Sequence, residues 1–203
     1  MSISNTLPGK PPPDYKETLY WKISEKASTT IIMNLLSIPL AIVSGIGFFT
    51  FANMFGKPQG ITGGILNFGL ILIIGMIVVI ALHEFAHGMA MKIFGAPVKY
   101  GFIWKGLMFY ATSPGYAFQR NRYIVIILAP LVSLSLLACF GILVLAGTSM
   151  IWLLAVWAAI NGGAAIGDLW IMVIVLRYPS YAYIIDERDG MRIFMPQNES
   201  GSE

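Results

Sequence analysis

The sequence of 203 residues has little charge and almost no cysteine. Charged residues make up 11% of the chain, against about 25% in typical soluble domains, and 57% of the residues are hydrophobic. Such a composition makes a soluble enzyme, a disordered regulator and a nucleic-acid-binding domain poor interpretations. The single cysteine, Cys139, excludes an intramolecular disulfide and a cysteine-rich metal site. The composition therefore predicts an integral protein of the lipid bilayer, with no nucleic-acid partner.

Long stretches without charge predict the membrane spans. A spanning helix needs about 20 mostly apolar residues, and the gaps between charged residues provide four such stretches. We expect spans near residues 29–53, 64–92, 123–146 and 151–176. The third and fourth are joined by only a few residues, a connection short enough to force an antiparallel helical hairpin.

The lysines and arginines predict the orientation of these spans. Twelve of the 13 lie before the first span, around the loop between the second and third, or after the fourth, which leaves Lys57 alone on the other side. Cytoplasmic loops carry such an excess of basic residues. We therefore expect a multi-pass protein of the cell membrane, with both termini and the 93–122 loop in the cytoplasm.

The segments outside the spans are expected to be small. The proline-rich residues 1–28 predict a disordered cytoplasmic tail, ahead of a transmembrane domain over 29–176. In the cytoplasmic segment 177–203, apolar runs on both sides of Asp189-Gly190 predict a small hairpin, followed by an unstructured end at 198–203.

The loop over residues 98–118 contains two aromatic and β-branched runs, which are divided by Lys105-Gly106. These runs predict a short β-hairpin. A free strand edge there could hold an extended peptide substrate, and an interfacial aromatic anchor is an equally good interpretation. The expected fold class is an all-α membrane protein with about four transmembrane helices and a short β-hairpin in the loop between spans two and three.

Both histidines of the chain lie in one motif within the second expected span. His83-Glu84-Phe85-Ala86-His87 has the H-E-x-x-H pattern, which places all three polar side chains on one face of a helix. Two imidazoles one turn apart can bind a single Zn²⁺, and the adjacent carboxylate can take a proton from water. An unpaired carboxylate inside the membrane costs at least about 2.5–3.5 kcal/mol. This cost favours metal binding over the alternatives, a satisfied polar cluster or a proton relay.

A catalytic zinc site needs a third protein ligand, and Asp168 is the only other acid inside an apolar span. His83 lies nine residues before Lys92, and Asp168 lies nine residues before Arg177. Both groups are therefore expected about 13 Å below the charged boundary. We predict that Asp168 is the third ligand; the alternative is an acid with internal hydrogen bonds only.

Asn161 and a run of small residues precede Asp168. Asn161 lies two turns before Asp168 on the same helix face, where it could hydrogen-bond a substrate carbonyl or a developing oxyanion. It could equally satisfy backbone groups near the glycines of 162–167. These small residues permit close helix contact, which either the approach of Asp168 to a metal or helix packing alone explains.

At these residues the sequence resembles the site-2 protease family of intramembrane zinc metalloproteases, and most closely its compact zincin peptidase branch with about four spans. The resemblance is carried by residues 81–88 in the second span and by Asn161 through Asp168 in the last, with a weaker match at Ala129-Pro130-Leu131.

The resemblance implies a set of roles and a substrate class. It implies that His83, His87 and Asp168 bind zinc and that Glu84 activates water. It also implies a substrate-clamping strand and a membrane protein as substrate.

The expected function is therefore that of a zinc endopeptidase that cuts membrane-embedded or membrane-adjacent proteins, with Asn161 steadying the oxyanion. The first alternative is a transporter or channel that uses the His/Glu/Asp cluster as a metal or proton path, and the second is an inactive relative that binds membrane partners. The second span carries no charge from Pro58 through Leu82, so its polar groups lie on one side only. Such a one-sided pocket favours the hydrolase.

Overall fold

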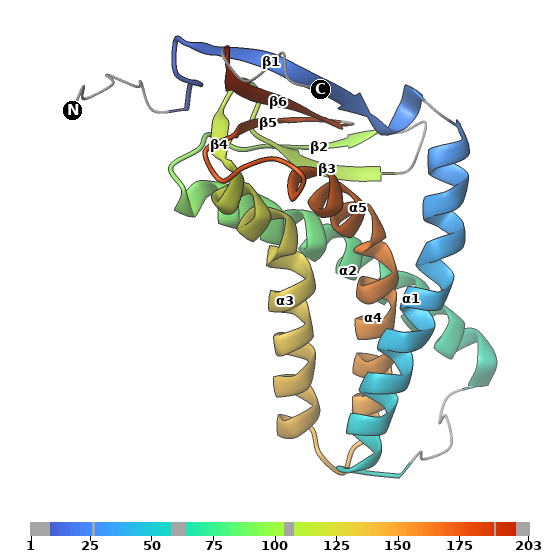
Figure 1. Ribbon diagram of the computed structural model, residues 1–203. Helices are drawn as coiled ribbons and strands as arrows, with labels where there is room; N and C mark the ends of the chain where they lie inside the picture. The colour runs from blue at the N-terminus through green and yellow to red at the C-terminus, as the bar shows by residue number, and fades with distance from the viewer. Residues whose placement is uncertain (1–8, 26, 58–63, 104–107, 189, 198–203) are drawn as a thin grey trace.

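The computed structural model describes residues 9–25, 27–57, 64–103, 108–188 and 190–197. Its helices form a bundle, and the described strands gather at one end of that bundle (Figure 1). The turn between the third and fourth long helices lies at the opposite end.

The long apolar stretches are helical, as the sequence predicts. The helices are α1 (Ala27–Asn53), α2 (Gly64–Ile93), α3 (Arg120–Val144), α4 (Met150–Ala164) and α5 (Ile166–Val175), after a 3-10 turn at Ile23–Glu25. With α4 and α5 taken together, four helices are long and apolar enough to cross a membrane. The ends of these helices lie within three residues of the predicted bounds.

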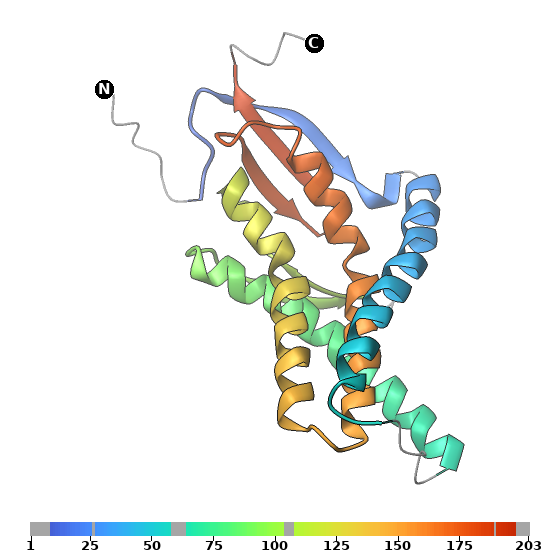
Figure 2. The same cartoon turned by 60° about the horizontal axis from the view of Figure 1, so that its bottom comes forward.

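The fourth expected span is confirmed in its bounds, but its helix is interrupted. It divides at Ala165, and α5 is inclined to α4 in both views (Figure 2). Glycines on both sides of the break (Gly162, Gly163 and Gly167) lower the helix propensity of this segment. Asn161 consequently lies in the last turn of α4, whereas Asp168 lies in the first turn of α5.

The glycine pair at the end of α4 packs against α1. A Cβ atom at Gly163 would come within 2.9 Å of the Ala41 Cβ, and one at Gly162 would overlap the Ser44 side chain. Helix packing, one of the two explanations that the sequence leaves open, therefore accounts for these two glycines.

A four-stranded antiparallel sheet corrects the all-α expectation. Its order is β1-β6-β5-β4, with β1 (Tyr15–Lys22), β4 (Ala117–Gln119), β5 (Tyr183–Glu187) and β6 (Gly190–Pro196). The expected disordered tail is wrong for Tyr15–Lys22, which pairs with β6 and buries part of Leu19 and Trp21 against the main core. The β5–β6 hairpin is confirmed, but Asp189 and the end at 198–203 lie outside the described residues.

The predicted hairpin between α2 and α3 is also confirmed. It consists of β2 (Lys99–Ile103) and β3 (Met108–Thr112), while the turn at Lys105-Gly106 lies outside the described residues. The Tyr100 ring lies directly over Gly88 of α2, where a Cβ atom would overlap it, and is stacked on Phe85 at 6.2 Å between ring centroids. The missing side chain at Gly88 thus lets the hairpin lie against the helix that carries the H-E-x-x-H motif.

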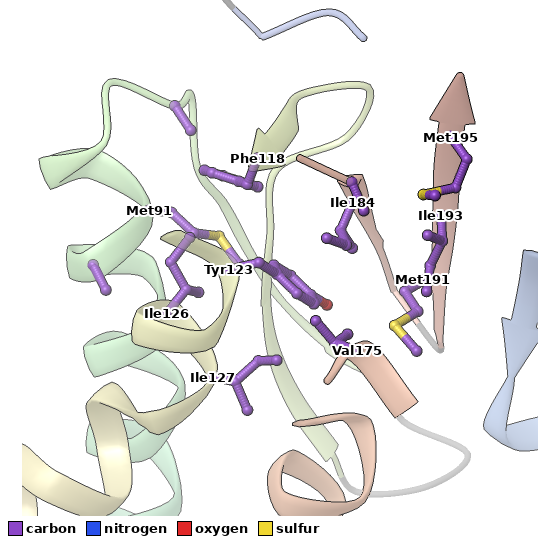
Figure 3. Close-up of a cluster of buried hydrophobic side chains, with 13 residues drawn as sticks. Met91, Phe118, Tyr123, Ile126, Ile127, Val175, Ile184, Met191, Ile193 and Met195 are labelled. Carbon is purple, nitrogen blue, oxygen red and sulfur yellow. The ribbon is translucent and has the colours of Figure 1, made fainter. Parts of the chain in front are cut away.

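The main core joins the sheet to the helix ends. It includes Met91 at the end of α2, Tyr123 near the start of α3, Val175 at the end of α5 and Ile184 of β5. Figure 3 shows the Tyr123 ring at the centre of this cluster. The segments next to the polar residues of α2 and α5 are therefore fixed against the sheet.

Candidate metal centre

The structure brings His83, His87 and Asp168 together. The Nε2 atom of His83 lies 3.0 Å from Oδ2 of Asp168, and Nε2 of His87 lies 3.3 Å from Oδ1. The three side chains are only 8–16% exposed. Two histidines from α2 and one aspartate from α5 thus point ligand atoms at a common place.

The other ring nitrogens fix the tautomer of both imidazoles. Nδ1 of His83 lies 3.0 Å from the carboxamide oxygen of Asn161, and Nδ1 of His87 lies 2.9 Å from the carbonyl oxygen of Ile126. Because both partners are acceptors, each Nδ1 carries the proton and donates it. In the neutral rings each Nε2 therefore presents a lone pair toward the Asp168 carboxylate.

These lone pairs could hold a cation. Two imidazole nitrogens and a carboxylate are all acceptors, so a shared proton or a metal ion among them would stabilise their approach to 3.0–3.3 Å. Protonation of both rings would place two imidazolium groups with centroids 5.1 Å apart in a largely buried site, which is costly. One divalent cation satisfies all three groups at once.

Zinc fits this donor set. Two imidazole nitrogens and one carboxylate oxygen form a known catalytic ligand set, with a fourth position left for water or substrate. Ligand atoms about 2.0–2.2 Å from a tetrahedral zinc lie about 3.3–3.6 Å from one another. The separations of 3.0 Å to Oδ2 and 3.3 Å to Oδ1 of Asp168 are close to this range, and they end on different oxygens of the carboxylate.

Glu84 lies beside these groups but has its own partner. His83, Glu84 and His87 offer ligand atoms that all lie within 4.8 Å of one another, so Glu84 competes with Asp168 for the place of third ligand. The Oε2 atom of Glu84, however, accepts a hydrogen bond of 2.9 Å from the backbone N–H of Ala111 in β3. Asp168 contacts both imidazoles, while the hydrogen bond to Ala111 engages one oxygen of Glu84.

The same hydrogen bond shows which edge of β3 faces the motif. Ala111 is opposite Tyr100 in the hairpin, yet its N–H points to Glu84 on the other side. Backbone groups alternate along a strand, so the N–H and C=O of Phe109 face the same way as those of Ala111. Among the described residues β3 pairs with β2 only, so this edge has no strand partner, and its Ala111 N–H is bonded to Glu84.

Asn161 has a partner that neither sequence interpretation included. It is 1% exposed, and its carboxamide oxygen accepts the Nδ1–H of His83. Its Nδ2 atom lies 3.5 Å from the carbonyl oxygen of Pro130 in α3. Both ends of the Asn161 amide are therefore used on the Nδ1 side of His83, away from Asp168.

Asp186 of β5 is a further acid near the centre that the sequence analysis did not single out. The Tyr123 hydroxyl donates a hydrogen bond of 2.9 Å to its carboxylate, and the Thr112 hydroxyl lies 3.5 Å from its carbonyl oxygen. Burial raises the pKa of Asp186 to about 6, although the hydrogen bond from Tyr123 acts in the opposite direction. Asp186 thus connects the four-stranded sheet to α3 and to the end of β3.

Comparison with known proteins gives one match. Residues 76–183, more than half of the chain, match the model of a family described as "Putative zincin peptidase". This range includes the H-E-x-x-H motif, the β2–β3 hairpin, α3 and Asp168. No curated protein and no solved structure matches the chain. Together with a His-Glu-His group able to hold a metal, the match over more than half of the chain shows that the chain belongs to this zincin-type peptidase family.

Proposed function

We propose that the protein is an intramembrane zinc metallopeptidase of the site-2 protease type, which hydrolyses peptide bonds of membrane-embedded or membrane-adjacent proteins. The observation that carries the proposal is the convergence of His83, His87 and Asp168 at 3.0 and 3.3 Å. These residues lie in helices that are long and apolar enough to cross a membrane, beside an open strand edge. A site of this kind combines a metal with a place for an extended peptide.

Different residues of the chain would bind the metal, transfer protons and orient the base during hydrolysis. His83, His87 and Asp168 would hold zinc, which supplies a Lewis acid and a source of nucleophilic water at neutral pH. Glu84 takes a proton from the attacking water and returns one to the leaving amine nitrogen. The Ala111 N–H orients the Glu84 carboxylate for this transfer through its 2.9 Å hydrogen bond.

The open edge of β3 supports a substrate bound as an added strand. A helical membrane segment must unwind before water can reach its peptide bond, and an extended segment can then pair with a free strand edge. The Ala111–Glu84 contact places this edge directly beside the proposed base. This favours the substrate-clamping interpretation of the hairpin over that of an interfacial anchor.

The distribution of charge supports a cytoplasmic site. Basic residues of β1, β2, β6 and the start of α3 lie at the end of the bundle that carries the strands (Figure 1), while Lys57 follows α1 at the other end. Because cytoplasmic segments are enriched in lysine and arginine, we place the strand-bearing end in the cytoplasm. The proposed cut then falls in or beside the cytoplasmic half of the bilayer.

The cavity beyond Asn161 weighs against a transporter. A cavity of about 400 Å³ lies between α2, α3 and α4, and Asn161 is its only lining residue with a hydrogen-bonding side chain other than Trp157. The remaining lining residues are apolar or glycine, from Ile71 to Leu82 on α2 and from Leu134 to Ala138 on α3. An ion or proton path needs polar groups across the membrane, and among the described residues only Asn161 and Trp157 offer polar side-chain atoms to this cavity.

Glu84→Gln tests the proposed reaction. The amide cannot accept the proton, so we expect cleavage of a single-pass membrane protein in proteoliposomes to fall by about 10²–10⁴-fold, while zinc content stays unchanged. Glu17→Gln, at a partly exposed site on β1, is the matched control. Product peptides are measured by mass spectrometry. A Glu84→Gln variant as active as the parent would contradict the assigned role, and a parent that binds zinc but cleaves nothing would support the inactive relative.

A further inference from the structure

A buried proline lies inside α3 next to the metal centre. Pro130 is under 2% exposed and stands in the middle of the helix. In a regular helix the N–H of residue 130 would bond to the carbonyl oxygen of Ile126. Proline has no N–H, and its ring also displaces the carbonyl group four residues earlier. The Ile126 carbonyl is therefore left without its helical donor.

This carbonyl is the one that accepts the hydrogen bond from His87. The Nδ1–H of His87 donates to Ile126 over 2.9 Å. Without a partner, a buried carbonyl in an apolar setting is costly, so the imidazole and the carbonyl satisfy each other. The proline thus creates an acceptor where the second proposed ligand needs one.

The carbonyl oxygen of Pro130 itself contacts Asn161, which holds the other histidine. It lies 3.5 Å from Nδ2 of Asn161, and the carboxamide oxygen of Asn161 accepts the Nδ1–H of His83 over 3.0 Å. The Nδ1 atoms of both imidazoles are consequently fixed through a single turn of α3.

We propose that Pro130 is a positioning residue of the metal centre, which acts by withholding an N–H and so freeing the Ile126 carbonyl to orient His87. The inference rests on the proposed zinc site. Groups that hold the non-ligating nitrogen of a metal-bound histidine change metal affinity by about 10–100-fold. Pro130→Ala restores the competing N–H, so the His87 imidazole loses its acceptor.

The test is zinc affinity of the purified full-length protein in detergent, measured by competition with a chromophoric chelator. Pro130→Ala is expected to bind zinc about 10–100-fold more weakly than the parent. Pro39→Ala is the matched control, because Pro39 also lies inside a helix but is exposed on α1. We expect Pro39→Ala to bind as the parent does.

A backbone ester at position 130 separates the effect of the missing N–H donor from the effect of the proline ring. Lactic acid in place of Pro130 has neither N–H nor ring, and we expect it to retain zinc affinity within a factor of a few. The inference would be overturned if the ester and Pro130→Ala lost zinc affinity equally, or if Pro130→Ala kept the parental zinc affinity. Histidine ¹⁵N chemical shifts of the parent give a readout that needs no variant, since the inference requires a protonated Nδ1 on His87 and is overturned by a protonated Nε2.

The controls distinguish this inference from the metal centre on which it rests. A parent without zinc affinity, or a His87→Ala variant with parental affinity, would refute the metal centre itself. If the parent binds zinc and His87→Ala does not, parental affinity in Pro130→Ala refutes only the role of Pro130.

Discussion

Asn161 connects a proposed zinc ligand to the neighbouring helix. Its carboxamide accepts from His83 and donates toward Pro130, so both of its polar atoms face protein groups. Asn161→Ala removes the acceptor of the His83 Nδ1–H, and we expect zinc affinity to fall by about 10–100-fold. Chelator competition measures this, with Asn34→Ala on an exposed face of α1 as control. Parental zinc affinity combined with lost cleavage would instead support an oxyanion role.

The raised pKa of Asp186 predicts that the stability of the folded protein depends on pH. Burial raises its pKa from the ordinary value of 3.8 to about 6, so the folded protein holds this proton more tightly than the unfolded chain. The resulting stabilisation is complete below about pH 4 and is lost as the pH rises through 6. We expect the free energy of unfolding of the parent to fall over this range relative to Asp186→Asn, by at most about 3 kcal/mol. Denaturant unfolding in detergent measures it.

Asn retains an oxygen that can accept from the Tyr123 hydroxyl, so Asp186→Asn changes the titration with little change in contacts. Asp14→Asn, at an exposed position, is the control that should follow the parent. Identical pH profiles for the parent and Asp186→Asn would show that this carboxylate does not titrate as described.

The sequence predicted which side chains form the candidate site better than it predicted which backbone groups contact them. The H-E-x-x-H motif and the isolated Asp168 were visible because polar residues are rare inside apolar spans. The Ala111 N–H and the Ile126 carbonyl have no signature in residue type, so the sequence could not place them at the centre. Pro130 was the one visible sign of a free carbonyl in α3.

Among the elements, the β2–β3 hairpin depends on a glycine of α2. Gly88→Ala would drive a methyl group into the Tyr100 ring, and such overpacking costs about 1–3 kcal/mol. We expect the hairpin to shift away from α2, so that the Ala111–Glu84 contact weakens and cleavage falls while zinc content is unchanged. Cleavage and zinc content are both measured on the purified variant. Gly69→Ala in the same helix meets no atom within 4 Å and should behave as the parent; parental cleavage in Gly88→Ala would contradict the dependence.

The helices were predictable because the length of an apolar run directly reports a span. Two other features, the strand at Tyr15–Lys22 and the break at Ala165, were not predictable from the sequence. The strand Tyr15–Lys22 gains its stability by pairing with β6, a segment about 170 residues later, and its alternation of polar and apolar residues is weak on its own. The break at Ala165 lies in a glycine-rich run that is compatible with either a kinked or a continuous helix.

At the scale of the whole molecule, the sheet fixes the end of the bundle that contains the centre. Segments from both ends of the chain form this sheet, and the main core joins it to α2, α3 and α5. The histidines of α2 and the aspartate of α5 are thereby held at a fixed separation. The sequence placed these groups at one depth, but only the three-dimensional arrangement shows that their ligand atoms face one another.

Zinc stoichiometry tests this central claim most directly. Full-length protein is loaded with zinc, freed of weakly bound metal by a mild chelator, and analysed for metal per chain. We predict one zinc per chain in the parent and in Asp186→Asn, and none in Asp168→Ala, because the carboxylate that completes the donor set has been removed. A parent without zinc, or an Asp168→Ala variant that keeps the full equivalent, would contradict the account.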